Sequence, residues 1–399
     1  MQSYDKSRLG LYLHIPFCRA KCAYCDFYSL PAQSEELMQR YTDALIAHMQ
    51  SYKKGAKDYV ADTVFIGGGT PTSLPPQMLY QIIRAVKRNF SLVRDAEFTV
   101  EANPATVDHA MLTHLRRLGV NRISMGLQSA NNNELMALSR IHRRQDFEAS
   151  FRAARRARIG NINVDVMFGI PYQTKESLMK TLRWLVKLGP EHISLYDLIL
   201  EPGTRLYAQR QTLPFPSEDE EADMYFMAVE FLAKHGYAQY EISNFARPGY
   251  MCRHNLKYWN CEEYLGLGAA AHSFFRGNRF AVVRDAERYM KGIEAPTSAV
   301  RITQQNDAVS PKERLGEYIM LRFRLAAGLD CRDFARRFGT SFENLYGRKM
   351  QPYVQHGYAT FRDGVYALTP RGMFVSNYIL SDLLDFADLG GSGMFDGNR

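Results

Sequence analysis

The sequence predicts an α/β protein with two parts: a partial TIM-type barrel of six βα units, (βα)6, and a smaller C-terminal α+β domain of winged-helix-like type. The barrel is predicted because apolar stretches of strand length alternate with amphipathic stretches of helical length from residue 9 to about residue 200. The smaller domain is predicted because helical patterns and one hairpin follow residue 310. With 399 residues, 46% of them hydrophobic, the chain is long enough to form both cores.

Six apolar stretches are predicted to form the parallel strands of the barrel, because a helical segment separates each from the next. They are residues 9–15, 63–66, 97–100, 122–125, 162–166 and 192–195. In barrels of this type, the loops at the carboxyl ends of the strands build the active site. The residues that follow each strand are therefore the first place to look for function.

Polar and glycine residues gather at these strand ends. The first strand runs into a loop with three cysteines, the second into residues 67–70, the third into 101–104 and the fourth into 126–129, and the fifth carries Asp165. One glycine-rich loop alone is more often a simple turn. Five such features at one rim favour a ligand site.

We expect four segments along the chain: the barrel with its cysteine loop in residues 1–210, a capping segment in 211–305, the winged-helix-like domain in 306–390 and a disordered tail in 391–399. Pro214 and Pro216 precede an acidic run, which predicts a loop and then a helix at about 219–235. Further helices are predicted at 311–326, 331–338, 342–356 and 369–384, with a hairpin at 359–368 that turns at Asp363 and Gly364.

Charge and hydropathy exclude some classes of partner. The net charge of +8 is dispersed along the chain, which favours anionic ligands only weakly. Winged-helix modules bind DNA or only contact protein, and no dense face of arginine and lysine is visible, so we expect no nucleic-acid partner. No transmembrane stretch and no apolar signal core are found, so we expect a cytoplasmic protein.

The loop after the first strand contains a CxxxCxxC motif formed by Cys18, Cys22 and Cys25. In a sequence without secretory features, such cysteines indicate a metal site rather than disulfides. A [4Fe-4S] cluster held by three cysteines leaves one iron open to a further ligand. Structural zinc needs a fourth protein ligand, and the candidates are Cys252, Cys261, Cys331 or a histidine. A zinc-stabilised winged-helix binding protein would leave the other rim loops unexplained.

The CxxxCxxC spacing, the preceding residues 14–17 (HIPF) and Tyr24 before the third cysteine resemble the radical S-adenosylmethionine (SAM) superfamily, in its coproporphyrinogen dehydrogenase-like branch. The resemblance implies a radical SAM barrel in which Cys18, Cys22 and Cys25 hold a [4Fe-4S] cluster and SAM binds the open iron. It leaves open whether one or two SAM molecules bind. The residues that it implies contact SAM are Tyr12, Tyr24, Gly68, Gly69, Thr70, Glu101, Gln128, Arg140 and Asp165. The alternative role for Glu101 is an internal ion pair with an arginine such as Arg122, because an unpaired carboxylate at the end of a buried strand is costly.

Two features separate this chain from the oxygen-independent coproporphyrinogen III dehydrogenases. Those enzymes carry a fourth cysteine two residues after the third, where this chain has Phe27, and an extension ahead of the first strand. Both departures, together with the segment 252–259 (CRHNLKYW), resemble the HemW branch of haem chaperones. The resemblance implies haem binding with His254 as the candidate ligand, beside the flat rings of Tyr258 and Trp259. A hydrogen-bonded structural role is the alternative for His254, and the weaker haem-ligand candidates are Cys252, Cys261 and His272.

The implied function is a haem chaperone on a radical SAM scaffold, which binds a [4Fe-4S] cluster, SAM and haem and delivers haem to acceptor proteins. The alternative is an enzyme, an oxygen-independent coproporphyrinogen III dehydrogenase, in which SAM cleavage starts the oxidative decarboxylation of propionate side chains. An electron donor is required if SAM is cleaved, and a homodimer is compatible with the sequence. Phe27 at the place of the fourth cysteine argues against the enzyme.

Overall fold

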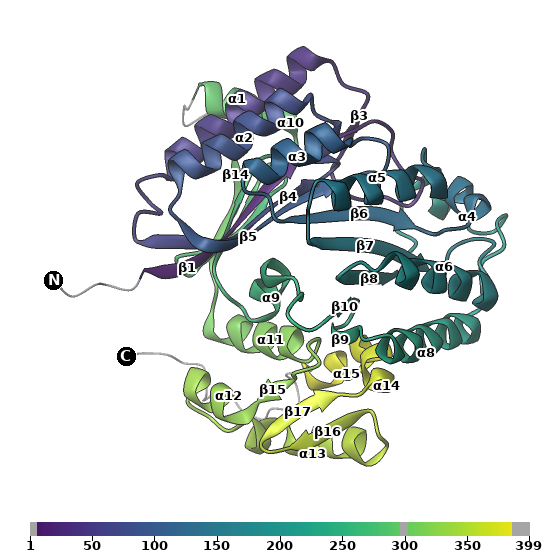
Figure 1. The fold of residues 1–399 in the computed structure, drawn as a ribbon. Coiled ribbons are helices and arrows are strands. Elements are labelled where there is room, and N and C mark those ends of the chain that lie inside the picture. Colours follow the sequence, from purple (N-terminus) through teal and green to yellow (C-terminus); the bar gives the residue numbers. More distant parts are fainter. Residues whose placement is uncertain (1–5, 296–301, 385–399) are drawn as a thin grey trace.

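The structure, a computed structural model, describes residues 6–295 and 302–384, without the side chains of residues 305–307. The expected tail at 391–399 lies outside the described residues. Six parallel strands form the centre of a twelve-stranded sheet (Figure 1). In spatial order they are β1 (Ser7–Ile15), β4 (Tyr59–Gly68), β5 (Leu92–Ala102), β6 (Arg122–Gln128), β7 (Asn161–Phe168) and β8 (His192–Asp197). Each contains one of the six predicted stretches, so the predicted α/β fold with six βα units is confirmed.

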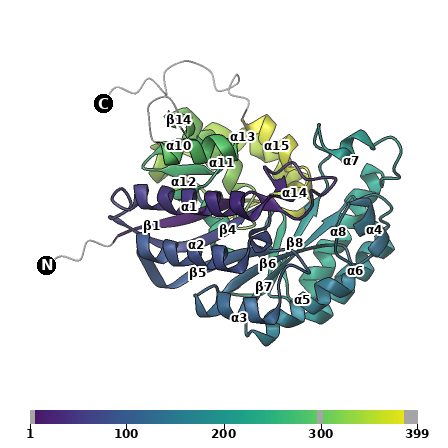
Figure 2. The same ribbon diagram turned by 90° about the horizontal axis from the view of Figure 1, so that it is seen from above.

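The crossover helices cover the outer face of this sheet in an arc (Figure 2). Helix α2 illustrates the cause, because its buried residues Leu79, Ile82, Ile83 and Val86 recur at the spacing that puts them on one face. At the start of α1, the Ser34 hydroxyl accepts a hydrogen bond from the Leu37 N–H and caps the helix. The outer helices are α1 (Glu35–Tyr52), α2 (Pro76–Asn89), α3 (His109–Arg117), α5 (Arg144–Arg156) and α6 (Lys175–Leu188).

Both edges of the sheet are extended by strands that the sequence pattern did not predict. Beside β1, β11 (Tyr264–Leu267) pairs in parallel, and β12 (His272–Phe275), β13 (Asn278–Val282) and β14 (Thr303–Ala308) follow in antiparallel order. Beside β8 lie β10 (Asn244–Ala246) and β9 (Ala238–Glu241). Strands of this length are too short to show a hydrophobic period. The segment expected to act as a cap therefore also continues the sheet.

The C-terminal part has its own core and a three-stranded sheet. Residues Phe323, Phe334, Phe342 and Tyr346 are fully buried there. Its helices are α11 (Pro311–Arg322), α12 (Cys331–Phe338), α13 (Phe342–Gln355), α14 (Pro370–Phe374) and α15 (Ser376–Leu383), and its strands are β15 (Leu329–Asp330), β16 (Ala359–Arg362) and β17 (Val365–Leu368). The helix predicted at 369–384 is divided, because the backbone leaves helical geometry at Val375.

The turn between β16 and β17 confirms the predicted hairpin. Asp363 and Gly364 have φ values of 53° and 79°. Positive φ at both central residues is the type I′ geometry that joins two antiparallel strands, and Asp-Gly is among its preferred sequences.

Helix α8 (Glu218–Lys234), predicted at about 219–235, links the two cores. On one side it buries Met224, Ala228 and Leu232 against the barrel. On the other, the rings of Tyr225 and Phe226 lie 5.3 and 5.5 Å from the ring of Phe374 in α14. The remaining elements are β2 (Phe17–Cys18), β3 (Leu30–Pro31), a 3-10 helix η1 (Pro71–Ser73), α4 (Asn132–Ala137), α7 (Arg205–Ala208), α9 (Arg253–Trp259) and α10 (Ala286–Glu294). None of the helices in the described ranges has the length and apolar character needed to cross a bilayer.

Candidate functional site

The three cysteines lie on a loop that joins β1 to α1 and is fixed at its base and its middle. At the base, β2 pairs in parallel with β3, and the Leu30 N–H donates to the Pro16 carbonyl at 2.6 Å. In the middle, the Ala23 N–H donates to the Leu138 carbonyl at 3.0 Å, and the Ala23 carbonyl accepts from the Leu206 N–H at 2.9 Å. These backbone bonds hold the loop over the carboxyl ends of the strands.

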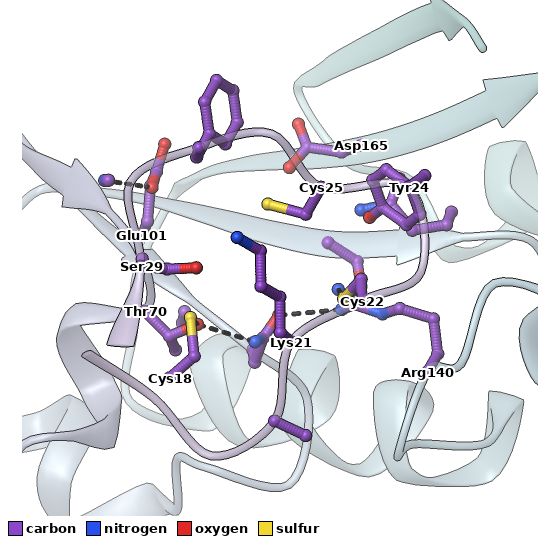
Figure 3. A pocket seen from close by; sticks show the side chains of 18 of the residues that line it. Cys18, Lys21, Cys22, Tyr24, Cys25, Ser29, Thr70, Glu101, Arg140 and Asp165 are labelled. Atoms are coloured by element: carbon purple, nitrogen blue, oxygen red, sulfur yellow. Dashed lines mark hydrogen bonds between the residues drawn. The ribbon is translucent and has the colours of Figure 1, made fainter. Parts of the chain in front are cut away.

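The cysteine loop and the strand ends enclose a cavity of about 140 Å³, here called the cluster cavity (Figure 3). Its walls come from this loop, from the ends of β4, β5 and β6, from β7 and from the segment after α4. Every residue predicted to bind the cluster or SAM lines this cavity except Tyr12; they are Cys18, Cys22, Tyr24, Cys25, Gly68, Gly69, Thr70, Glu101, Gln128, Arg140 and Asp165. The parallel topology thus brings residues from the cysteine loop, from four neighbouring strands and from the segment after α4 into one concave site.

The glycines at the end of β4, Gly68 and Gly69, are required by close packing against β1 and the cysteine loop. Gly68 has a φ of 112°, and a Cβ there would lie 2.5 Å from the ring of His14. A Cβ on Gly69 would lie 2.7 Å from the carbonyl oxygen of Phe17. The Gly69 N–H donates to the Ile15 carbonyl at 2.8 Å. Only residues without a side chain let the second rim loop approach the first this closely.

Asn103 connects the rim loops, although the sequence analysis placed it only in the strand-end segment 101–104 and not among the ligand-binding residues. Its Nδ2 donates to Thr70 Oγ1 at 2.7 Å, and its Oδ1 accepts from Arg140 Nη2 at 2.8 Å. Arg140 Nη1 in turn lies 3.3 Å from Cys22 Sγ. The signal that could have indicated Asn103 is its position two residues after Glu101 in the same strand-end loop.

Glu101 and Asp165 place two carboxyl groups at the cluster cavity. Glu101 Oε2 accepts a hydrogen bond from the Gly68 N–H at 3.1 Å, and Asp165 Oδ1 accepts from Asn163 Nδ2 at 2.7 Å. Burial raises the pKa of Glu101 to about 8, and the nearby charge of Asp165 adds to this rise. Burial also raises the pKa of Asp165.

An ion pair between Glu101 and Arg122 was the alternative to a ligand-binding role. Arg122 instead donates from Nη1 to Asn161 Oδ1 at 2.9 Å. Among the residues that the structure describes, no basic side chain pairs with Glu101. A buried carboxyl group without a cation fits a cationic ligand, and the ammonium and sulfonium groups of SAM are cations.

The donor set of the cluster cavity fits a cluster with one open iron better than a single metal ion. Burial raises the pKa of Cys18 and of Cys25, so their thiolates need a positive partner. Within residues 6–295 and 302–384, no three His, Cys, Asp or Glu side chains converge on one ion position. Cys252, Cys261 and Cys331, which are candidates for a fourth zinc ligand, do not line the cluster cavity.

A larger cavity of about 490 Å³, here called the barrel cavity, adjoins the cluster cavity at the strand ends. The two share part of their lining, including Cys25, Phe27 and Glu101. Tyr24 also lines both, and burial raises the pKa of its hydroxyl. The volume lies in the range of small-molecule binding sites, so the two cavities together have room for more than the cluster.

His254 lies in the core rather than in a cavity wall. Its side chain is on α9, it is 1% exposed, and its Nδ1 lies 2.8 Å from Thr63 Oγ1. Its Nε2 lies 2.8 Å from the Tyr258 hydroxyl. Burial lowers the pKa of His254 to about 3, so the ring is neutral. Both ring nitrogens therefore have hydrogen-bond partners, as expected if His254 has a structural role. Haem ligation by His254 stays a prediction.

Tyr12 is the one predicted SAM residue that does not line the cluster cavity, although burial and then the nearby charge of Glu101 raise the pKa of its hydroxyl. It lines a third cavity, of about 560 Å³, on the side of β1 where β11 to β14 extend the sheet. This lateral cavity is also lined by His272, one of the weaker haem-ligand candidates.

Six parallel βα units, with a CxxxCxxC loop after the first strand and a polar rim around it, define a radical SAM protein. The model of the radical SAM superfamily matches residues 12–185, and the model of the HemN C-terminal domain matches residues 309–375. Members of this superfamily use SAM together with a [4Fe-4S] cluster.

Relatives with assigned names match almost the whole chain. Heme chaperone HemW of Bacillus subtilis (strain 168) is 35% identical over 378 residues, which cover 94% of this chain and 98% of that protein. Heme chaperone HemW of Escherichia coli (strain K12) is 33% identical over 377 residues, covering 93% and 97%. The chain belongs to the HemW family.

The fold is also found in a solved structure, that of coproporphyrinogen III oxidase (HemN) from Escherichia coli, described as a radical SAM enzyme. It superposes with a TM-score of 0.84 at 22% identity, over 96% of this chain and 92% of that one. At this identity the similarity establishes the shared fold alone.

Proposed function

We propose that this protein is a cytoplasmic haem chaperone, which binds haem on a radical SAM scaffold and delivers it to acceptor proteins. The observation that carries the proposal is the similarity to proteins named heme chaperone HemW along nearly the whole chain, including the C-terminal domain. The positive net charge is compatible with a ligand that carries two carboxylates.

In this proposal the cluster cavity holds a [4Fe-4S] cluster and SAM. Cys18, Cys22 and Cys25 would hold three of the four irons and would leave the fourth free to bind SAM. Glu101 and Asp165 face the cationic part of SAM, and the other SAM contacts are those of Tyr24, Gly68, Gly69, Thr70, Gln128 and Arg140. A reduced cluster supplies an electron to SAM when both are bound. Because Arg140 contacts both Cys22 and Asn103, we propose that SAM occupancy is sensed by the cysteine loop and controls haem release or dimerisation.

The second candidate function is that of an oxygen-independent coproporphyrinogen III dehydrogenase, and the match of residues 309–375 to the HemN C-terminal domain model is compatible with it. Phe27 opposes it, because this ring stands where those enzymes carry a fourth cysteine. The Phe27 side chain is 72% exposed and lines the cluster, barrel and lateral cavities. An apolar surface beside the cluster suits a bound macrocycle better than redox chemistry by a thiol.

One anaerobic experiment separates the two functions. Protein reconstituted with iron and sulfide is titrated with haem and then mixed with apomyoglobin, while a second sample receives SAM, reductant and coproporphyrinogen III. We expect one equivalent of bound haem, transfer to apomyoglobin and no protoporphyrinogen IX. Sustained formation of protoporphyrinogen IX would make the protein an enzyme, and failure of the protein to bind haem would remove the chaperone proposal.

A further inference from the structure

The lateral cavity is a site of the right size for a macrocycle, and it is separate from the SAM residues apart from Tyr12. Its volume of about 560 Å³ falls within the usual range of ligand and cofactor pockets. One wall is the cysteine loop at Asp26 to Tyr28, and the opposite wall is the strand extension β11 to β14. The cavity therefore begins at the residue that follows the last cluster cysteine.

The strand register places aromatic and small side chains on one face of this cavity. Tyr264 of β11 pairs with Gly10, two residues before Tyr12, so the two tyrosines point to the same face of the sheet. His272 pairs with Ala281 on the neighbouring strand and lines the same cavity. The cavity is thus lined by aromatic rings, including those of Tyr12 and Tyr264, and by small side chains such as Ala281, and such a lining suits a planar apolar ligand.

The cavity has one open histidine. His14 also lines it, but its Nε2 lies 3.0 Å from the Tyr28 carbonyl and its Nδ1 lies 2.9 Å from the Tyr12 hydroxyl. Since a carbonyl only accepts, Nε2 carries the proton and Nδ1 accepts from Tyr12. His272 is exposed, and its ring makes no hydrogen bond to any part of the chain that the structure describes. A neutral imidazole with a free nitrogen is a common axial ligand of haem iron.

A cation lies at the same cavity. Arg284 is exposed and donates from Nη2 to the Asp26 carbonyl at 2.6 Å, with the Asp26 carboxylate 3.7 Å away. The guanidinium has five N–H donors, so it can bind a ligand carboxylate while it keeps this backbone contact. A tetrapyrrole with propionate groups presents such a carboxylate.

We propose that the lateral cavity is the haem site, with His272 as an axial ligand of the iron and Arg284 as the partner of a propionate. The inference rests on the proposed haem-binding function and adds the site and its ligand. The haem plane lies against Tyr264 and Phe27, in contact with the loop that carries the cluster cysteines.

The same geometry gives His254 a positioning role. Its Nε2 holds the Tyr258 hydroxyl at 2.8 Å, and the Tyr258 ring lines the lateral cavity and meets the Tyr264 ring edge to face at 4.6 Å. Loss of His254 would therefore loosen the aromatic wall without removing the iron ligand. Removal of His272 would take away the ligand itself.

The test compares histidine variants of the reconstituted full-length protein by haem titration, magnetic circular dichroism and thermal unfolding. His272→Gly should lose the histidine-ligated spectrum, bind haem at least about tenfold more weakly, and recover the spectrum when imidazole is added. His254→Ala should keep the ligation type and lower the affinity. His356→Ala changes an exposed histidine in the C-terminal domain and is the matched control, which should equal the wild type.

Two further variants test the cavity independently of the ligand. Ala281→Trp fills the space next to His272 and should abolish haem binding without lowering the melting temperature of the C-terminal domain. Arg284→Gln should weaken binding of haem but not of haem dimethyl ester, which has no free carboxylate.

The outcomes separate the site from the function. If the wild type binds haem but His272→Gly keeps both spectrum and affinity, the site is wrong and the chaperone function stands. If His254→Ala removes the histidine-ligated spectrum and His272→Gly does not, the ligand is His254 and the inference fails. If the wild type does not bind haem, the proposed function fails first.

Discussion

Replacing Glu101 by glutamine should stabilise the fold without SAM and weaken the binding of SAM. The carboxyl group is buried beside Asp165, and no basic side chain in the described ranges neutralises it. Its pKa in the fold, about 8, lies above the ordinary value of 4.5. Below pH 4.5 the carboxyl group is neutral in both the folded and the unfolded chain, so it does not destabilise the fold. As the pH rises from 4.5 to about 8, the unfolded chain ionises first, and the stability of the fold falls.

The size of this loss of stability follows from the two pKa values, 4.5 and about 8. At about 1.4 kcal/mol for each pKa unit, the ionised carboxylate costs the SAM-free fold at most about 5 kcal/mol above pH 8. Glutamine keeps the size of the side chain and removes this cost. The melting temperature of Glu101→Gln should exceed that of the wild type at pH 9 and approach it at pH 5.

The assay is thermal unfolding at pH 5 and pH 9, with and without SAM, on anaerobic protein. SAM should stabilise the wild type at pH 9 and have much less effect on Glu101→Gln, because the cationic ligand loses its carboxylate. Glu230→Gln makes the same chemical change at an exposed ion pair with Lys234 on α8 and should alter neither readout. Equal stabilisation of Glu101→Gln and the wild type by SAM, or no gain of stability at pH 9, would refute the reasoning.

Three other predictions test the cysteine loop and the C-terminal hairpin. Replacing the three motif cysteines by alanine together should abolish the brown iron–sulfur absorbance, and a retained full cluster would contradict the ligand assignment. Gly69→Ala should reduce the iron bound after reconstitution, because the new Cβ would lie 2.7 Å from the Phe17 carbonyl oxygen. Gly160→Ala is the control, because a Cβ at Gly160 would meet no atom within 4 Å. Equal iron contents in the two variants would contradict the role of Gly69. Gly364→Ala should lower the free energy of unfolding of the C-terminal domain by about 1 kcal/mol, the usual cost of a non-glycine residue with left-handed backbone geometry. Hydrogen exchange of the β16 and β17 amides should become faster in this variant. Unchanged exchange rates would contradict the prediction.

The barrel strands were predictable because their signal is local. A barrel strand shows a short run of alternating apolar residues: in β7, Ile162, Val164 and Val166 are buried in the core and alternate with Asn163 and Asp165, which line the barrel cavity. The strands that extend the sheet carry no such run, and β12 mixes the exposed His272 with the buried Ser273 and Phe275. Their pairing depends on neighbours far away in the sequence.

The cluster cavity was predictable for a topological reason. Consecutive parallel strands end at one edge, so residues as distant in sequence as Cys18 and Asp165 meet there without any local signal that joins them. Asn103 was missed because its role is to bridge Thr70 and Arg140, and such a role exists only once the loops are side by side.

By itself, the sequence determined the six βα units, the thiol loop after the first strand and the hairpin at Asp363 and Gly364, since each depends on residue types at short spacing. Only the tertiary structure decided which histidine is open to a ligand. The ring of His254 is closed off by Thr63, which lies 191 positions earlier in the chain, while His272 stands on an edge extension beside a cavity. Burial and hydrogen bonding are set by such distant contacts, and no local pattern of residues records them.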